Sequence, residues 1–451
     1  MFDPSLRYGI LGMARSGIAA AHKIREFGGT AFLSELQPKD KIENAEELIR
    51  DFECEFGGHT DRLFECGLWI VSPGIPLDIP IIKAGRKKGI PMISEIEFGF
   101  QIKDPGCRII GVTGSNGKST TASLIHHILQ NMGYQSLLAG NIGSAWSGYP
   151  IHQPGYDFVV LELSSFQLDL IDSFRPDVAV LLNITPDHMN RYASFEDYRD
   201  SKFRILMNQT AEDHAVICLD SPPVAEYLPQ IKARVHRYSL EEKYPKSDAW
   251  LDGIFIHTGP KHRFSIHDLK IKGPHNQANA MAALLSVVAL TNNPARAIDG
   301  IQGFMPLTHR LEYVDTIGGV AFYNDSKATN SDSVKSALMS FDRPIRVIMG
   351  GSDKGEDFSV MTDLLKKWAL KVYITGETEA KMRQAWLGKV PLVCINDFET
   401  CIRTAYEESL AGDIIVLAPA CASFDKFRNF EHRGDTFKQI VHTIARENEK
   451  K

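Results

Sequence analysis

Residues 111–120 read Gly-Val-Thr-Gly-Ser-Asn-Gly-Lys-Ser-Thr, directly after an apolar run and directly before a helical pattern. A glycine-rich turn between a strand and a helix lets backbone N–H groups surround phosphate oxygens at the positive end of the helix. In such a loop Lys118 can reach the β- and γ-phosphates of a nucleotide, and the hydroxyl group of Ser119 or Thr120 can contact Mg²⁺. The strict pattern requires glycine at position 112, where this chain has valine. The stretch predicts a variant phosphate-binding loop; the alternative is a glycine-rich turn without a ligand.

The length, composition and net charge of the chain limit the classes of protein to which it can belong. A chain of 451 residues is longer than a domain with a single hydrophobic core usually is. A typical domain length of about 100–200 residues predicts about three domains. Hydrophobic residues make up 43% and charged residues 24%, as in an ordinary globular protein. A formal net charge of −6 provides no broad attraction to nucleic acid or to anionic membranes, so no nucleic-acid partner is expected.

The sequence contains neither a membrane segment nor a disulfide framework. No apolar run approaches the roughly 18–20 residues that cross a bilayer, and residues 1–5 do not begin a signal peptide. We therefore expect a cytoplasmic protein without membrane insertion. The seven cysteines are scattered and contain no C-x-x-C pair, which favours reduced, mostly buried thiols over a zinc site.

Short apolar runs alternate with amphipathic stretches over residues 7–93, which is the rhythm of a parallel βαβ sheet. The first run leads into a degenerate dinucleotide-binding pattern with glycines at positions 9, 12 and 17. On this segment alone, a turn without a ligand is an equally good interpretation. Glu35 ends the second predicted strand, and Ser72-Pro73-Gly74 follow the third. Residues 1–93 are predicted to form a Rossmann-like domain.

Two further α/β series follow. Residues 94–296 are predicted to form a central domain with strands at 107–113, 158–163 and 178–183, helices ending at 132 and covering 195–208, and added β structure at 234–269. Residues 297–451 are predicted to form a third domain with strands near 321–324, 346–349, 372–375, 392–395 and 414–417. The predicted class is α/β with three domains: a Rossmann-like N-terminal domain, a P-loop ATPase domain around a parallel sheet, and a Rossmann-like C-terminal domain.

Polar residues follow the strands after the phosphate-binding loop. Because ligands of parallel sheets bind beyond the carboxyl ends of strands, Glu162 would face the nucleotide and can bind Mg²⁺; a buried acid satisfied by backbone donors is the alternative. His188, beside Asp187, can ligate a metal or hold substrate, although a lone histidine on a loop is often only solvated. Lys202, on the next helix, carries no signal beyond that of an ordinary solvated lysine.

Further polar clusters lie later in the chain. Asn276 and Asn279 stand three residues apart at a helix start, where they can bind a ligand, or Asn276 can cap the helix. In the third domain, polar loops at 324–330, 350–354 and 418–427 each follow a predicted strand, and a polar segment at 308–312 precedes them. Several such loops at one cleft indicate a binding site.

In this order the motifs resemble those of the Mur ligases, the ATP-dependent ligases of bacterial peptidoglycan synthesis, over essentially the whole chain. The resemblance rests on residues 113–119, 161–167, 183–191, 275–279, 324–330 and 419–425. The last two motifs resemble those of the family members that add D-glutamate. The resemblance implies an N-terminal domain that holds the UDP part of UDP-N-acetylmuramoyl-L-alanine, a central ATPase domain, and a C-terminal domain that closes over ATP and D-glutamate.

The resemblance also implies a role for individual residues. The implied UDP-substrate contacts are Arg15, Ser16, Gly17, Glu35 (a position where the family often has Asp), Ser72, Pro73 and Gly74, with Asn141 and Ser164 at the sugar or peptide. The implied ATP contacts are Gly114, Ser115, Asn116, Gly117, Lys118, Ser119, Thr120, Asn279, Arg310, Asp325 and Lys327. D-glutamate would contact Thr329, Lys354, Ser423 and Phe430.

The implied catalytic residues are Lys118, Glu162, His188, Lys202 and Lys327. Mg²⁺, as a pair of ions, would be held by Ser119, Glu162, His188 and a carbamylated Lys202. The resemblance further implies a monomer that activates a carboxylate as an acyl phosphate before an amine attacks it.

Other classes of protein also need a phosphate-binding loop. A nucleotide-gated switch would not need a UDP-binding domain or the polar loops of the third domain. Folylpolyglutamate synthetase resembles the central and last domains but lacks a domain before the loop. The diaminopimelate-adding relative carries an Asp-Asn-Pro-Arg motif, and the most similar string here is Asn-Asn-Pro-Ala at 292–295.

Overall fold

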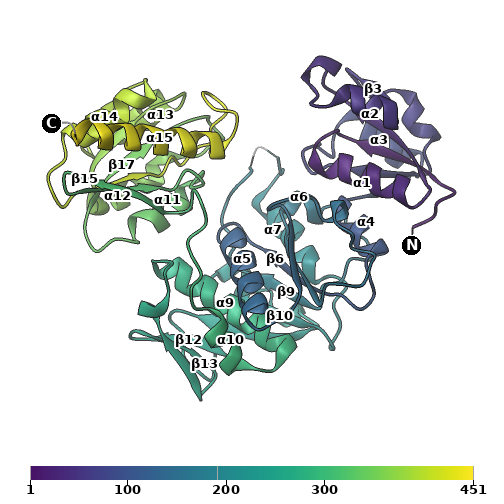
Figure 1. Ribbon diagram of the computed structural model, residues 1–451, viewed down its shortest axis with the longest axis horizontal. Coiled ribbons are helices and arrows are strands. Elements are labelled where there is room, and N and C mark those ends of the chain that lie inside the picture. The colour runs from purple at the N-terminus through teal and green to yellow at the C-terminus, as the bar shows by residue number, and fades with distance from the viewer. Residues whose placement is uncertain (1, 190, 450–451) are drawn as a thin grey trace. The chain divides into compact units, whose positions relative to one another are not determined.

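The computed structural model describes residues 2–189 and 191–449, so Asn190 of the motif at 183–191 lies outside the described residues. The chain divides into two compact units. The first unit contains the described residues of Met1–Ile184, Ser194–Ser265 and Asn279–Gln302, and the second those of Thr185–Ala193, Ile266–Ala278 and Gly303–Lys451. Three separate sheets, each with helices beside it, confirm the predicted α/β class (Figure 1).

The first sheet lies in the first unit and has five parallel strands in the order β3-β2-β1-β4-β5. Its strands are β1 (Arg7–Leu11), β2 (Thr30–Glu35), β3 (Glu53–Phe56), β4 (Leu68–Val71) and β5 (Met92–Ile93). Its helices are α1 (Arg15–Glu26), α2 (Ala45–Asp51), α3 (Pro80–Lys87) and α4 (Glu95–Ile102), with short 3₁₀ turns η1 (Lys39–Lys41) and η2 (Asp61–Glu65). The strand order reverses between β1 and β4, which is where a Rossmann-like sheet binds its ligand.

The second sheet has nine strands in the order β14-β13-β12-β11-β10-β9-β6-β8-β7. Its strands are β6 (Arg108–Thr113), β7 (Ser136–Gly140), β8 (Phe158–Glu162), β9 (Val178–Leu181), β10 (His214–Cys218), β11 (Arg234–Ser239), β12 (Ala249–Asp252), β13 (Phe255–Thr258) and β14 (His262–Ser265). The strands from β7 to β12 are parallel, whereas β13 and β14 are antiparallel additions. The predicted β structure at 234–269 is therefore confirmed as the far edge of this sheet.

The helices around the second sheet position its loops. They are α5 (Lys118–Asn131), α6 (Ser165–Leu168), α7 (Phe195–Phe203), α8 (Pro222–Ala225), α9 (Pro274–Thr291) and α10 (Pro294–Gly300), with η3 (Trp146–Gly148), η4 (Arg204–Leu206), η5 (Leu228–Gln230) and η6 (Ile266–Asp268). The helix predicted at 195–208 ends as α7 and continues only as the 3₁₀ turn η4. Asn131 Nδ2 donates to the carbonyl oxygen of Gly300 at 2.8 Å, so α10 is packed on α5. The predicted domain limits of 1–93, 94–296 and 297–451 stay predictions.

The third sheet lies in the second unit, in the order β15-β16-β20-β17-β18-β19. Its strands are β15 (Glu312–Ile317), β16 (Val320–Asn324), β17 (Ile345–Met349), β18 (Ala369–Ile374), β19 (Leu392–Cys394) and β20 (Ile414–Leu417); only the β15–β16 pairing among these described strands is antiparallel. Its helices are α11 (Ser331–Leu338), α12 (Thr362–Trp368), α13 (Glu379–Trp386), α14 (Phe398–Glu407) and α15 (Phe430–Asn448), with η7 (Phe358–Met361).

Both faces of the third sheet are covered by helices. Val347 and Met349 of β17 pack into one apolar cluster, while Ile348 between them packs into a second cluster with Phe437 of α15. Alternate side chains of a strand point to opposite faces, so a run that is apolar throughout marks a sheet buried on both sides. No helix among the described residues is long and apolar enough to cross a membrane.

Candidate active site

The loop between β6 and α5 has the conformation of a phosphate-binding loop. Gly114 has φ +151° and Gly117 has φ +86°, conformations that favour glycine. A Cβ atom on Gly117 would lie 2.4 Å from Oδ1 of Asn279, so glycine is also needed for the loop to approach α9. The structure thus brings Asn279 to the loop, as predicted, and buries Ser119 and Thr120 in the first turn of α5.

Two lysines donate hydrogen bonds to the backbone of this loop. Lys118 Nζ lies 2.9 Å from the carbonyl oxygen of Gly114 and 2.7 Å from that of Ser115. Lys202 Nζ, from α7, lies 2.9 Å from the same Gly114 oxygen, and Lys202 is only 2% exposed. The interpretation of Lys202 as a solvated lysine is therefore wrong. Two ammonium groups at the N-terminus of a helix create a strongly positive site suited to an anion.

Asn183, which follows β9, holds the loop in place. Its carbonyl oxygen accepts the N–H of Ser115 at 2.7 Å, and its Oδ1 accepts the N–H of Asn116 at 2.9 Å. Its Nδ2 donates to the carbonyl oxygen of Asn116 at 3.0 Å. The hydroxyl group of Tyr198 lies 2.9 Å from that of Ser115. Asn183 belongs to the motif at 183–191 that the sequence analysis identified, but its hydrogen bonds to the phosphate-binding loop are seen only in the structure.

A buried carboxylate stands at the carboxyl end of the neighbouring strand. Glu162 ends β8 and is 2% exposed, and its Oε1 accepts Nδ2 of Asn141 at 2.8 Å. Asn141 follows β7, so the two predicted residues lie together at one edge of the sheet. Ser164 lies nearby in the chain, and its hydroxyl group forms a reciprocal cap of α6 with Gln167.

The predicted UDP contacts lie at the turn between β1 and α1 and at the turn after β4. Glu35 Oε2 accepts the N–H of Met13 at 2.7 Å, and Ser72 Oγ donates to the carbonyl oxygen of Gly12 at 3.0 Å. A Cβ atom on Gly17 would lie 2.1 Å from that same oxygen, so these turns are packed closely. Arg15, beside Ser16, donates to the carbonyl oxygen of Gly143 at 2.8 Å. Pro73 and Gly74 continue the second turn, which follows the fourth strand and not the third, because β3 was not predicted.

In the second unit, the loops after β16, β17 and β20 meet at the carboxyl ends of adjacent strands. Ser352 pairs with Ala422 in a β-bridge, and the N–H of Ala420 donates to the carbonyl oxygen of Ala328 at 2.9 Å. Three of the polar loops predicted to share a cleft are therefore in contact. Their predicted residues are Asp325, Lys327, Thr329, Lys354 and the buried Ser423.

Two pairs of predicted residues are in contact within this cluster. Lys327 Nζ lies 3.7 Å from the centre of the Phe430 ring, a cation–π contact. Lys354 Nζ lies 3.4 Å from the carbonyl oxygen of Thr329. Both lysines therefore have defined positions at the carboxyl ends of the strands.

The carboxyl group of Asp325, one of the predicted site residues, has a raised pKa. Desolvation of its carboxyl group raises its pKa to about 7, opposed by the Arg310 guanidinium and by a hydrogen bond from the N–H of Leu311. His188 has φ +58° and lies beside Asp187, whose Oδ2 accepts Nδ2 of Asn330 at 3.1 Å. The second unit therefore holds His188 through its neighbour Asp187.

Sequence analysis missed Arg433, a buried charged residue in the first turns of α15. Arg433 is 2% exposed and donates to the hydroxyl and carbonyl oxygens of Ser326 and to the carbonyl oxygens of Cys421 and Ala422, at 2.9–3.1 Å. Burial lowers its pKa to about 10. Its guanidinium joins the loop after β16 to the loop after β20. The sequence analysis selected Phe430 from the Phe-Glu-His-Arg string at 430–433, but nothing in that string indicates that the arginine is buried.

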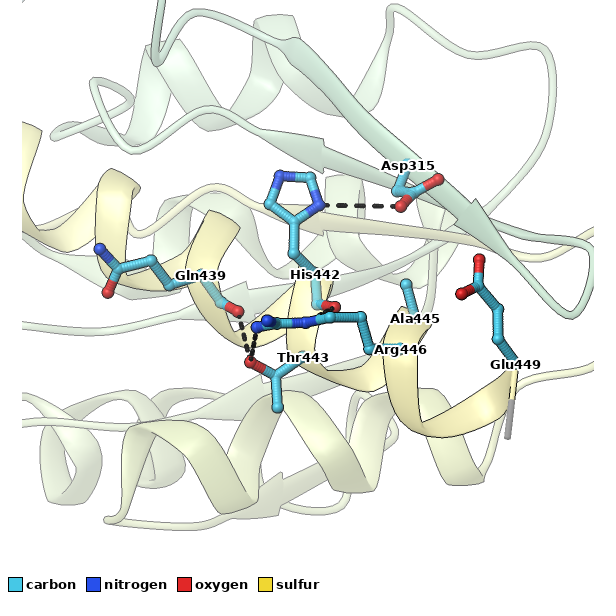
Figure 2. A pocket seen from close by; sticks show the side chains of 7 residues that line it. All are labelled: Asp315, Gln439, His442, Thr443, Ala445, Arg446 and Glu449. Atoms are coloured by element: carbon cyan, nitrogen blue, oxygen red, sulfur yellow. Dashed lines mark hydrogen bonds and ion pairs between the residues drawn. The ribbon is translucent and has the colours of Figure 1, made fainter. Parts of the chain in front are cut away.

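An open groove lies elsewhere in the second unit. It has a volume of about 750 Å³ and is lined by Asp315, Gln439, His442, Thr443, Ala445, Arg446 and Glu449. Figure 2 shows His442 of α15 directed toward Asp315 of β15, with 3.7 Å between Nδ1 and Oδ2. None of the predicted site residues lines this groove, so its size does not identify the site.

Comparison with known proteins identifies relatives for the whole chain. Family models for the MurD N-terminal domain, the Mur ligase middle domain, and the Mur ligase glutamate ligase domain match residues 7–79, 112–287 and 309–421. Proteins named UDP-N-acetylmuramoylalanine–D-glutamate ligase are 38% identical in Koribacter versatilis, over 98% of both chains, and 40% identical in Cytophaga hutchinsonii, over 97% of this chain and 98% of the other. The crystal structure of MurF ligase from Thermotoga maritima in complex with ADP covers 92% of this chain and 95% of its own, with a TM-score of 0.62 at 17% identity.

Proposed function

The chain belongs to the Mur ligase family, and from this membership we propose that it joins D-glutamate to UDP-N-acetylmuramoyl-L-alanine with ATP, releasing ADP and phosphate. The observation that carries the proposal is the similarity, over nearly the whole length of both chains, to relatives named for this reaction. The product is a precursor of bacterial peptidoglycan. The phosphate-binding loop, the buried Glu162 and the polar loops of the third sheet supply the chemical groups that this reaction needs.

We assign the ATP phosphates to the loop at 114–120. Its backbone N–H groups, the N-terminus of α5 and the ammonium group of Lys118 are all suited to bind anionic oxygen. The hydrogen bond from Lys118 to the Gly114 carbonyl oxygen keeps this charge at the mouth of the loop. Further ATP contacts are proposed for Asn279, Arg310, Asp325 and Lys327. The related MurF structure, which holds ADP, supports a nucleotide site in this fold.

The chemistry follows from the poor reactivity of a carboxylate toward an amine. Transfer of the γ-phosphoryl group of ATP to the L-alanyl carboxylate gives an acyl phosphate, whose phosphate is a good leaving group. The amino group of D-glutamate then attacks the carbonyl carbon, and phosphate leaves as the amide bond forms. Lys118 and Lys327 neutralise charge that accumulates on the transferring phosphoryl group, and most of the acceleration comes from this neutralisation and from positioning.

The donor groups present are compatible with Mg²⁺, a hard cation that prefers oxygen ligands. Glu162 offers a buried carboxylate at the strand end and Ser119 a hydroxyl group in the first turn of α5. Within residues 2–189 and 191–449, no three His, Cys, Asp or Glu side chains are grouped so that they could hold a metal by themselves. We propose that Ser119, Glu162, His188 and a carbamylated Lys202 hold a pair of ions, which supply charge neutralisation between the two reacting anions.

Carbamylation of Lys202 is supported by its burial. Burial disfavours the charged ammonium form of a lysine, and the neutral amine is the form that reacts with CO₂ to give a carbamate with anionic oxygen donors. Lys202 is 2% exposed and lies next to the loop that we assign to ATP. Lys202 and Glu162 together with Lys118, His188 and Lys327 form the proposed catalytic set.

The two other substrates are assigned to different parts of the chain. We propose that the UDP part contacts the turns with Arg15, Ser16, Gly17, Glu35, Ser72, Pro73 and Gly74, and that Asn141 and Ser164 contact the sugar or peptide. D-glutamate is assigned to Thr329, Lys354, Ser423 and Phe430. Charge-assisted hydrogen bonds between Lys354 and a carboxylate give this site its preference for an acidic amino acid.

We further propose that the protein acts as a monomer in the cytoplasm. All seven cysteines are free thiols, as expected in a reducing compartment. ATP and the other proposed substrates are also cytoplasmic metabolites.

The test of the proposal is phosphate release from ATP in the presence of UDP-N-acetylmuramoyl-L-alanine. We expect release to require D-glutamate, and L-glutamate, L-lysine and diaminopimelate to be poor substitutes. Release with diaminopimelate or lysine in place of D-glutamate would assign the chain to another reaction of this family. ATP hydrolysis that needs neither the UDP substrate nor an amino acid would contradict the ligase function itself.

A further inference from the structure

We propose that Glu356 is a positioning residue for the amino-acid substrate, because its carboxylate fastens the loop that carries Lys354 to the start of α11, next to Thr329. The proposal rests on the proposed function, in which Lys354 and Thr329 contact D-glutamate. Glu356 itself is not expected to contact the substrate. It acts by holding two substrate-binding groups, from different loops, in one arrangement.

The contact that carries this inference is made by one carboxylate oxygen. Oε2 of Glu356 accepts the backbone N–H of Ser331 at 3.0 Å and its hydroxyl group at 2.6 Å. Ser331 is the first residue of α11, and Asn330 before it caps the helix through the N–H of Ser333 at 2.9 Å. The first N–H groups of a helix have no partner within the helix, and a negative charge there is favourable. Glu356 therefore supplies a second cap from a distant loop.

The loop is held on both sides of Lys354. Two residues before it, Ser352 forms the β-bridge with Ala422, next to Ser423. Two residues after it, Glu356 is bonded to Ser331. Gly355 between them has φ +83°, so the chain turns there. Lys354 Nζ then lies 3.4 Å from the carbonyl oxygen of Thr329. Loss of the Glu356 contact would release one end of this segment while the other stays fixed.

The charges around Glu356 favour a hydrogen-bonded anchor over a simple ion pair. Desolvation raises the pKa of Glu356, its two bonds to Ser331 oppose this, the nearby Asp187 carboxylate raises it further, and Lys354 lowers it. Asp187 is itself held in place, because its Oδ2 accepts Nδ2 of Asn330 at 3.1 Å. The carboxylate of Asp187 repels that of Glu356, so attraction to Lys354 alone does not hold Glu356 in place. Its hydrogen bonds to Ser331 do. A neutral amide with an oxygen at the same position should serve almost as well.

The experiment measures phosphate release with D-glutamate varied, for wild type, Glu356→Ala, Glu356→Gln and the control Asp357→Ala. Asp357 is the next residue and caps η7 through the N–H of Ser359 at 2.9 Å, so the control removes a cap from the same loop without touching Ser331. For Glu356→Ala we expect KM for D-glutamate to rise about tenfold, because Lys354 and Thr329 are then no longer held in one arrangement. KM for ATP should change by less than about twofold. Glu356→Gln and Asp357→Ala should stay within about threefold of wild type.

Hydrogen exchange of the Ser331 amide gives a readout that does not depend on activity. We expect exchange to be faster in Glu356→Ala than in wild type and in Asp357→Ala. An unchanged D-glutamate KM in Glu356→Ala, an equal rise in Glu356→Gln, or a Ser331 amide that exchanges at the wild-type rate in Glu356→Ala would each overturn the inference. A wild-type enzyme that does not use D-glutamate would overturn the proposed function instead, and the exchange experiment would still decide whether the anchor exists.

Discussion

Replacing Gly117 by alanine should damage the phosphate-binding loop in two separable ways. The residue has φ +86°, which is strained for any residue with a Cβ atom. The new Cβ atom would also lie 2.4 Å from Oδ1 of Asn279, closer than side chains approach in folded proteins. Asn279 would have to rotate away from the loop, although we assign it to the ATP site.

The chain contains a matched control for the first effect. Gly133 follows the other end of α5 with φ +92°, and a Cβ atom there would meet no other atom within 4 Å. Left-handed backbone strain alone costs about 1–2 kcal/mol, so Gly133→Ala should lower the free energy of unfolding by that amount. Gly117→Ala carries the same strain plus about 0.5–1.5 kcal/mol for forcing Asn279 off its rotamer. We expect a total of about 1.5–3.5 kcal/mol.

Urea denaturation and steady-state kinetics together test this expectation. The KM for ATP should rise about tenfold in Gly117→Ala, because the loop and Asn279 are both displaced, and should stay unchanged in Gly133→Ala. In a double-mutant cycle, Gly117→Ala combined with Asn279→Ala should cost about 1 kcal/mol less than the sum of the single variants, since the clash is then absent. Equal stabilities and equal ATP KM values for the two glycine variants would refute this account of the loop.

Three further predictions concern charged residues. Lys202→Ala should lose most activity and regain part of it with formate or acetate at high concentration, whereas Lys202→Arg should stay inactive; full activity of Lys202→Arg in CO₂-depleted buffer would contradict carbamylation. Lys354→Ala should raise the D-glutamate KM by about one to two decades, the equivalent of one charge-assisted hydrogen bond, and an unchanged value would remove Lys354 from the substrate site. The pKa of Asp325 is raised from 3.8 to about 7, so the native state binds the extra proton and this contribution to stability is lost as the pH rises toward 7. Asp325→Asn should therefore gain stability relative to wild type as the pH rises from about 4 to about 7, with no further gain above that, and a difference that stays constant across this range would argue against the raised pKa.

The elements that the sequence predicts are those whose signal is local. The strand, glycine turn and helix at 107–132 need only a short apolar run, glycines that accept positive φ, and the periodicity of an amphipathic helix. The same reasoning located β8, β9, β17, β18 and β20, which are buried on both faces and therefore read as continuous apolar runs. The polar residues that follow these strands were identified for the same reason.

The strands that were missed are mostly edge strands. β3, β7 and β15 each lie at the edge of a sheet. β3 and β15 have acids within the strand, as in Glu-Cys-Glu-Phe at 53–56, because one side of an edge strand faces solvent. Their place in the sheet depends on pairing with a neighbour distant in sequence, which periodicity does not encode. β10 is a different case, since it was not predicted although its Ala-Val-Ile run at 215–217 is as apolar as the strands that were.

The sequence by itself determined the class of fold, the phosphate-binding loop and, through the family resemblance, the candidate residues. Only the tertiary structure decided which charged groups are buried and what they hold. Without the family resemblance, the sequence around Lys202 indicates only an ordinary solvated lysine, yet its side chain donates to the loop 88 residues earlier. Arg433 and Glu356 fasten loops that are 107 and 25 residues away in the chain. Burial and hydrogen bonding depend on which segments pack together, and the properties of a charged side chain change with that packing while its local sequence stays the same.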